Sequence, residues 1–374
     1  MARSPSAPPL RVWVWIAATL ALVVVAALLW RNSDAAATES TTSAPADVPT
    51  GAPAGAVEEA WSADGNALPT DVVQEGRVVV GSDHGVRGVD VATGEVAWQY
   101  TRSNARLCGL TVADGVAVAV FRTAGRCDEA VALEAGTGVR AWTRNMSLRG
   151  DAVITSTASI VLASSPTGVV TFDPRGNNLR WRATPEEGCR WLGAVAGSAG
   201  VAVLERCADD GARLRLYDGF EGTELWTADL PGDDDVSLLG ADGLVGVRAG
   251  AEVRLFAPED GALRTTLPAE PAEAAGQTTA AGLALVRTGD VLSAIDPATG
   301  GTRWSVPADG LPAAAPVETG EVVVPTAEAF VRIDALSGLE LGRVTAADVP
   351  SDGVATVVGP VVVLRLDDGV RGYR

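Results

Sequence analysis

The chain has 374 residues, of which 47% are hydrophobic, so it can form two ordinary domains or one large all-β domain with a sizeable core. Its 29 basic residues are all arginines and stand against 47 acidic residues, which gives a formal net charge of −18. Because so acidic a surface repels phosphate backbones, we expect no nucleic-acid partner.

A long apolar run lies near the N-terminus. Residues 12–30 carry no charge and, as a helix, span roughly 28 Å, the thickness of one hydrocarbon core. Arginines precede the run and acidic residues follow it, which favours a cytoplasmic N-terminus. The sequence predicts a single-pass transmembrane signal-anchor helix at 12–30, with residues 1–11 as a cytoplasmic tail and the remainder extracytoplasmic. A cleaved signal peptide is the alternative, although its apolar region usually has only ~7–15 residues.

The segment that follows the apolar run has a biased composition. Residues 31–55 consist mainly of Ala, Thr, Ser and Pro. Such a segment buries too little apolar surface to offset its loss of conformational entropy. We therefore expect a flexible, disordered linker that holds a folded domain away from the membrane.

A hairpin motif recurs along the rest of the chain. In its first copy, "VRGVDVATGEVAW" (residues 86–98), alternating apolar residues lead to Asp90, a Thr-Gly turn and a strand with Trp98. Six further copies follow, with turn glycines 38 to 46 residues apart. These glycines are Gly94, Gly138, Gly176, Gly222, Gly261, Gly300 and Gly338. Two more apolar runs precede each hairpin, so each repeat predicts one four-stranded blade of a β-propeller.

The two ends of the chain supply one more blade. The chain ends in "VRGYR", which aligns with the start of the motif and therefore lacks a fourth strand. A strand near 57–63, with Trp61, has no hairpin before it and can complete this blade. We predict that residues 56–374 form an eight-bladed propeller of four-stranded antiparallel blades.

The recurring tryptophans and glycines have a structural interpretation. We expect the tryptophans to pack between blades and the glycines, among them Gly94, Gly138 and Gly300, to supply the turn conformation. The tryptophans are Trp61, Trp98, Trp142, Trp181, Trp226 and Trp304. Thr265 and Gly342 stand where other copies have Trp, and Pro258 where most have Asp, which predicts looser packing in those blades.

The pattern of Asp, Thr-Gly and Trp, as in Asp90…Gly94…Trp98 and Asp296…Gly300…Trp304, resembles the pyrroloquinoline-quinone (PQQ)-like repeat. The resemblance covers about residues 56–374. It implies the eight-bladed propeller shared by quinoprotein dehydrogenases and by the scaffold lipoprotein of the outer-membrane β-barrel assembly machine. It is specific for the fold and weak for activity, because many such propellers bind no quinone.

Four cysteines lie in the predicted extracytoplasmic domain, where disulfides are allowed. Cys108 and Cys127 are 19 residues apart, and Cys189 and Cys207 are 18 apart. Each pair brackets the first two strands of a repeat, which favours Cys108–Cys127 and Cys189–Cys207 over the other pairings. A zinc site is disfavoured, since the chain has no C-x-x-C and a single histidine.

Three further features of the sequence are candidate sites. His84, beside Asp83, fits a solvated loop better than a general base. "GDDDV" at 232–236 lacks the ligand spacing of an EF-hand loop. Trp191, beside Arg190, lies outside the recurring Trp position, so Arg190 and Trp191 are candidate ligand contacts at a channel mouth.

The sequence favours a non-enzymatic module for protein or ligand recognition at the bacterial cell envelope, with an envelope protein as partner. We expect no catalytic residue, cofactor or metal. The alternative that the resemblance implies is a PQQ-dependent dehydrogenase. Those enzymes are longer, and many carry adjacent cysteines under the quinone, whereas here no two cysteines are adjacent. A sensor domain is a further alternative and would need a membrane partner to pass on its signal.

Overall fold

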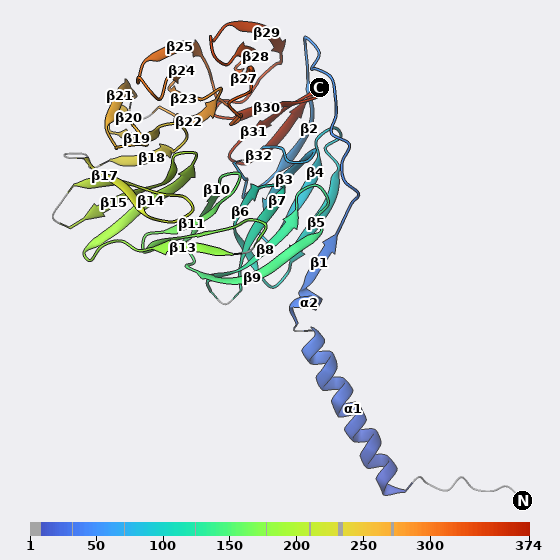
Figure 1. Cartoon of the computed structure of the whole chain (residues 1–374). Helices are drawn as coiled ribbons and strands as arrows, with labels where there is room; N and C mark the ends of the chain where they lie inside the picture. Colours follow the sequence, from blue (N-terminus) through green and yellow to red (C-terminus); the bar gives the residue numbers. More distant parts are fainter. Residues whose placement is uncertain are drawn as a thin grey trace, which may run out of the picture.

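Short antiparallel strands form eight sheets that surround a common centre in the computed structural model (Figure 1). The structure describes residues 9–374 except 32, 71, 124, 177, 209–210, 231–234 and 271–272. The predicted all-β, eight-bladed propeller is confirmed. Most of the predicted 1–11 tail, residues 1–8, lies outside the described residues.

We number the blades in chain order and name strands from the centre outward. Blade 1 holds β3 (Arg77–Ser82), β4 (Gly85–Asp90) and β5 (Val96–Arg102), with β1 (Thr38–Thr41) at its outer edge. Blade 2 holds β6 (Arg106–Ala113), β7 (Val116–Arg122), β8 (Cys127–Glu134) and β9 (Arg140–Leu148). Blade 3 holds β10 (Val153–Ser156), β11 (Val161–Ser165), β12 (Gly168–Phe172) and β13 (Leu179–Ala183). Blade 4 holds β14 (Cys189–Gly197), β15 (Gly200–Cys207), β16 (Ala212–Tyr217) and β17 (Glu224–Leu230).

The second half of the ring follows the same plan. Blade 5 holds β18 (Val236–Gly240), β19 (Val245–Ala249), β20 (Glu252–Phe256) and β21 (Leu263–Pro268). Blade 6 holds β22 (Ala275–Ala280), β23 (Leu283–Thr288), β24 (Val291–Ile295) and β25 (Thr302–Pro307). Blade 7 holds β27 (Glu321–Thr326), β28 (Ala329–Asp334) and β29 (Glu340–Thr345). Blade 8 holds β30 (Val354–Val358), β31 (Val361–Arg365), β32 (Gly369–Tyr373) and β2 (Glu59–Asp64), with the short β26 (Leu311–Pro312) beside β30.

Blades 1 and 7 depart from four regular strands because their innermost segments are reduced. In blade 1 this segment contributes the isolated bridge between Ala67 and Gly81. In blade 7 it contains Pro312 and Pro316, which lack the N–H that a strand ladder needs. Its strand β26 pairs in parallel with β30 of blade 8 instead.

The ring closes where the two ends of the domain meet. Strand β2 pairs antiparallel with the last strand, β32, and Trp61 lies opposite Gly372. A Cβ atom on Gly372 would lie 2.1 Å from the Trp61 ring, and one on Gly88 of blade 1 would lie 2.2 Å from Trp98. Gly372 in the motif that ends the chain therefore leaves space for an indole, as Gly88 does in the first copy. The predicted alignment of the two segments is correct.

The hydrophobic core is divided among the contacts between neighbouring blades. Between blades 1 and 2, for example, Val79, Val86 and Trp98 pack with Leu110 and Phe121. Alternation of apolar residues along each strand supplies two such faces per blade. Each blade is thus held by both neighbours, and the ring depends on closure.

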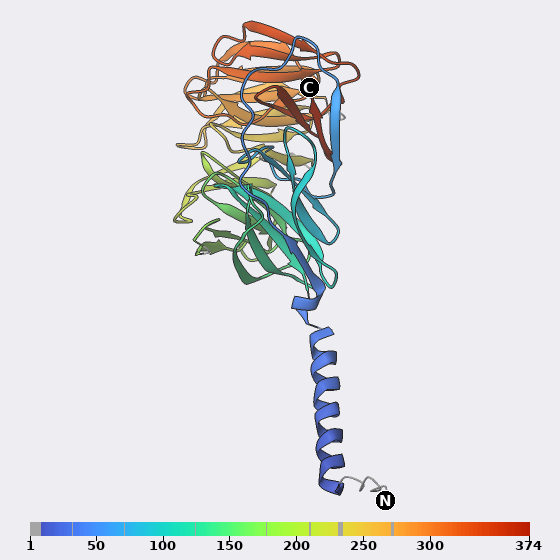
Figure 2. The same cartoon turned by 90° about the vertical axis from the view of Figure 1, so that its right-hand side faces the viewer.

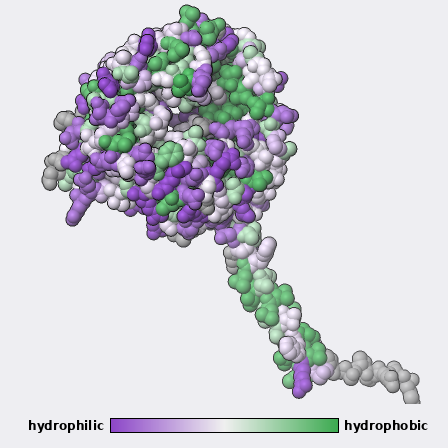
Figure 3. Space-filling model, viewed as in Figure 1, coloured by the Kyte–Doolittle hydropathy of each residue, from purple (hydrophilic) through white to green (hydrophobic). Residues whose placement is uncertain are grey.

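Helix α1 (Leu10–Arg31) stands clear of the propeller, and its surface is mostly hydrophobic, whereas the visible face of the propeller is mostly hydrophilic (Figure 3). Within the described residues it is the one helix long and apolar enough to cross a membrane. A membrane anchor and a signal sequence share these properties.

The segment expected to be a flexible linker differs from that expectation. A short helix, α2 (Asp34–Ala37), leads into β1, which pairs antiparallel with β5. Further along, Ser43 donates a backbone hydrogen bond to Thr137, and Gly55 accepts one from Thr345. The outer strand β5 offers unpaired backbone groups, and these capture a Thr-rich segment despite its low hydrophobicity.

Candidate functional site

A chain of hydrogen bonds links one blade to the next through the recurring tryptophans. Each indole N–H donates to a backbone carbonyl in the turn of the following blade. The pairs are Trp61–Val91 (3.1 Å), Trp98–Ala135 (2.9 Å), Trp142–Pro174 (2.8 Å), Trp181–Gly219 (2.9 Å), Trp226–Pro258 (2.9 Å) and Trp304–Ala335 (3.0 Å). These tryptophans therefore have structural surroundings and are not exposed ligand platforms.

Five of the seven turn glycines lie directly beneath these rings. Gly176 does not: its φ is not positive, and a Cβ atom there would meet Asp173 and Asn178. Gly94 and Gly138 have φ of +76° and +73°, and a Cβ atom on either would lie within 2.7 Å of Trp61 or Trp98, respectively. Gly300 also has positive φ, but its neighbour is the backbone of Arg264, because blade 5 carries Thr265 where a tryptophan would lie.

The other blade without a tryptophan is blade 7, and the structure supplies a reason. In blade 8, the outer strands β32 and β2 come from opposite ends of the chain, so no Thr-Gly turn joins them. A tryptophan at position 342 would therefore find no turn carbonyl to accept its indole N–H. Instead, residues 55–57 run beside β29, where Thr345 and Ala56 form a parallel bridge. Pro258, which stands where most copies have Asp, still provides a backbone carbonyl, and this carbonyl accepts a hydrogen bond from the indole of Trp226.

His84 lies in the exposed turn between β3 and β4. Its Nδ1 is 2.6 Å from the carbonyl oxygen of Ala105, and Asp83 accepts a hydrogen bond from Asn66. This geometry ties the turn to neighbouring loops and offers no paired base and nucleophile. In the "GDDDV" segment, Asp233 and Asp234 lie outside the described residues.

Both predicted disulfides are present, Cys108–Cys127 in blade 2 and Cys189–Cys207 in blade 4. Cys108 and Cys189 lie near the start of an innermost strand, Cys127 begins the third strand of its blade, and Cys207 ends the second strand. All four ends point to the same side of the ring, which carries the loops between blades. We call this side, at blades 2 and 4, the disulfide face.

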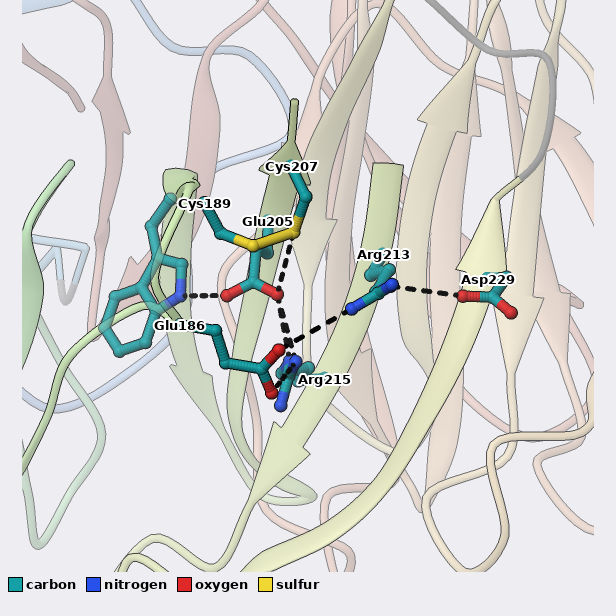
Figure 4. The surroundings of a disulfide bond; sticks show 8 residues. Glu186, Cys189, Glu205, Cys207, Arg213, Arg215 and Asp229 are labelled. Carbon is teal, nitrogen blue, oxygen red and sulfur yellow. Dashed lines mark hydrogen bonds and ion pairs between the residues drawn. A yellow bond between two sulfur atoms is a disulfide. The ribbon is translucent and has the colours of Figure 1, made fainter. Parts of the chain in front are cut away.

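An ionic cluster surrounds the disulfide of blade 4 (Figure 4). The guanidinium of Arg215 donates to Glu205 (3.2 Å), Glu186 (2.7 Å) and Glu224 (2.8 Å). Glu205 is only 1% exposed and also accepts from the indole of Trp191 at 3.0 Å. A buried carboxylate needs such partners, so the cluster fixes the loop that contains Glu186 against β15 and β16.

The electrostatics of this cluster follow from its geometry. Burial acts to lower the pKa of Arg215, but its hydrogen bonds to Glu186 and Glu224 raise the pKa above the ordinary value. The hydrogen bond from Arg215 in turn lowers the pKa of Glu186. Arg215 and Glu186 are therefore held in their charged forms and are poorly suited to proton transfer near neutral pH.

Cys189, Cys207 and Glu205 lie close enough together to suggest a metal site. The two sulfur atoms are joined in a disulfide, whereas a metal ligand would have to be a thiolate. This arrangement does not fit a metal centre.

The structure corrects the interpretation of Trp191. Its side chain is 2% exposed and packs near Tyr217, with ring centroids 6.5 Å apart, so it cannot stack on a ligand from solvent. A register shift in β14 between Trp191 and Gly193 leaves Leu192 without a cross-strand partner and 38% exposed. Arg190 is also exposed. Sequence reasoning found Arg190 but missed Leu192. Arg190, Trp191 and Leu192 alternate exposed, buried and exposed along β14, and this alternation is the signal that could have found Leu192.

The middle of the ring holds a cavity of about 670 Å³, lined by Ser198, Thr278 and Arg365 among others. Burial lowers the pKa of Arg365, and Asp367 acts in the opposite direction. A cavity of this volume could hold a small molecule, and its lining includes the carboxylates of Asp218 and Asp242 and several serine hydroxyls.

A family described as "Outer membrane protein assembly factor BamB" matches residues 27–187 and 249–372, more than half of the chain. The chain belongs to this BamB family. No curated protein sequence matches it significantly.

Solved structures resemble this BamB family member in fold. The crystal structure of BamB from Moraxella catarrhalis aligns with 85% of this chain and 99% of its own, with 16% identity and a TM-score of 0.51. The computationally designed Ika8 protein aligns with 84% of this chain and 99% of its own, with 15% identity and a TM-score of 0.57. A europium-containing methanol dehydrogenase aligns at 14% identity with a TM-score of 0.45, over 84% of this chain and 85% of its own. At such identities the likeness extends to the fold alone.

Proposed function

We propose that this BamB family member is a non-enzymatic, extracytoplasmic recognition module that binds an envelope protein through the disulfide face of blade 4. The observation that carries the proposal is the rigid loop surface there. The Cys189–Cys207 disulfide and the three carboxylates on Arg215 immobilise backbone that would otherwise be free. A surface that is ordered before binding loses less entropy when a partner docks.

Two exposed side chains give this surface a recognisable chemistry. Leu192 supplies an apolar contact and Arg190 a cation, and both flank the buried Trp191 on the innermost strand. Arginine on a rigid, well-packed base is typical of binding hot spots. The chemistry suits a partner segment that combines an apolar side chain with a carboxylate.

The experiment compares partner capture by surface variants of the full-length chain. Leu192→Asp and Arg190→Glu are expected to reduce co-purification of a chemically crosslinked envelope partner at least tenfold. Leu341→Asp is the matched control, because Leu341 is 50% exposed on the outer strand of blade 7. Equal capture by all three variants would refute the proposed surface.

The absence of catalysis is part of the proposal. Support comes from the near-uniform repeat length, which leaves no room for a long inserted loop, and from the lack of adjacent cysteines in the sequence. Titration with PQQ and calcium, followed by tryptophan fluorescence and dye reduction with alcohols, is expected to show no saturable response. Saturable binding with alcohol-dependent dye reduction would establish the dehydrogenase alternative.

A further inference from the structure

We infer that the edge of blade 2 lies against the membrane that holds α1 and binds anionic lipid headgroups through Arg106, Arg122 and Arg126. The inference rests on the extracytoplasmic placement in the proposed function and on the sequence prediction that α1 is an uncleaved membrane anchor. It adds a second binding surface, whose partner is a bilayer and not a protein.

The first step is that the chain leaves α1 and docks at once. Only residues 32–37 separate Arg31 from β1, which is roughly 20 Å even if fully extended. Asp34 forms an ion pair with Arg102 at 3.0 Å and accepts a hydrogen bond from Asn104 at 2.7 Å. The carbonyl of Ala37 accepts from the backbone of Ser103 at 2.9 Å. These contacts fix the loop between β5 and β6 close to the end of α1.

The second step is that the adjoining edge of the ring belongs to blade 2. Both views show residues of about 100–150 at the end of the propeller nearest α2, whereas the last blades lie at the far end (Figures 1 and 2). Arg106 follows the docked loop directly, Arg122 ends β7, and Arg126 immediately precedes β8. The Cys108–Cys127 disulfide ties these two segments together.

The third step concerns charge. Arg106, Arg122 and Arg126 are exposed, and none has a carboxylate partner within the part of the chain that the structure describes. Arg122 and Arg126 donate to the backbone carbonyls of Gly150 (2.5 Å) and Ser147 (3.0 Å), which orients the guanidinium groups but leaves their charges in place. The nearby Asp128 is held by Thr123 at 2.8 Å.

This local charge is unlike that of the whole domain. Residues 102–150 contain seven arginines and four acidic residues, whereas residues 32–374 contain 26 arginines and 47 acidic residues. Without a compensating surface, an acidic domain would be repelled by an anionic bilayer. A basic edge where the domain meets the membrane replaces that repulsion with attraction, which amounts to roughly fivefold per arginine close to the headgroups.

The test uses the full-length chain in nanodiscs of phosphatidylcholine, with and without 30% phosphatidylglycerol. Hydrogen exchange of the amides of residues 122–127 is expected to slow at least fivefold when phosphatidylglycerol is present. The triple variant Arg106→Gln, Arg122→Gln, Arg126→Gln should lose this difference, as should 0.5 M salt. Using the ratio between the two lipids removes any effect of the substitutions on local stability.

The matched control changes three exposed arginines on blades 5, 6 and 7, Arg264, Arg303 and Arg343, each to Gln, and is expected to keep the difference. Equal exchange in the two lipids, with the chain retained in the bilayer, overturns this inference and leaves the proposed protein-binding function standing. A chain that carbonate extracts from the bilayer contradicts the membrane anchor itself and overturns this inference with it.

Discussion

The indole of Trp98 is fully buried and donates to the carbonyl of Ala135 in the next blade, so it serves two blades at once. Loss of so large a buried side chain leaves a cavity and an unpaired carbonyl. We therefore expect Trp98→Ala to lower the free energy of unfolding by about 3–5 kcal/mol in urea denaturation. Trp13→Ala, at an exposed position of α1, is the control; similar losses for both would contradict the role of the indole.

The pKa of Glu186 is lowered by its hydrogen bond from Arg215, which gives a pH signature. A carboxyl whose folded pKa is depressed stabilises the protein above its unfolded pKa, and this contribution disappears as the pH falls through the folded value. We expect Glu186→Gln to lower the melting temperature at pH 7 and to have a smaller effect below pH ~4. An undiminished difference at acidic pH would show that the ion pair is not responsible.

Sequence reasoning at the residue scale succeeded where a pattern repeats and failed where it breaks. The regular spacing of seven turn glycines defined the repeat. Positions within the repeat then predicted the structural tryptophans and the two disulfides. Trp191 looked like a surface residue because it fell outside the repeat, but Glu205, fourteen residues away, gives its indole a buried partner. Leu192 alternates with the buried Trp191, but which side of β14 faces solvent depends on how blade 4 packs in the ring, and a single strand does not encode that.

At the element scale, each disulfide closes a segment within one blade, with a sequence separation of 19 residues in blade 2 and 18 in blade 4. The loop-entropy model assigns each roughly 3 kcal/mol of stability. We expect the double variants C189A/C207A and C108A/C127A to lose similar free energy in urea denaturation. Only C189A/C207A should also reduce capture of the envelope partner, because only that disulfide lies beside Leu192. Equal capture by the two variants would separate the disulfide of blade 4 from recognition.

The linker shows why composition alone is a weak guide to order. Residues 38–41 are polar and would be disordered in isolation, but the open edge of β5 provides a ladder of backbone partners. Edge strands pair with whatever backbone reaches them. Predicting this requires knowledge of which edge lies near the end of α1, and that is a property of the assembled ring.

For the whole molecule, stability depends on closing the ring between the chain ends. Gly372 lies against the Trp61 ring, whereas a Cβ atom on Gly320 would meet nothing within 4 Å. We expect Gly372→Ala to open the junction between β2 and β32 and to cost at least about 2 kcal/mol, while Gly320→Ala changes stability by less than about 0.5 kcal/mol. Urea denaturation of both variants measures this, and equal stability would mean that closure contributes little.

The recognition surface is the central claim about the molecule, and site-specific photocrosslinking in intact cells tests it most directly. A photoreactive residue is placed at Leu192, on the disulfide face of blade 4, or at Leu341, on the outer edge of blade 7. We predict a discrete crosslinked envelope protein from position 192 that is lost when Arg190→Glu is added, and none from position 341. Crosslinks of equal yield from both positions, or none from position 192 while position 341 captures a partner, would contradict the account.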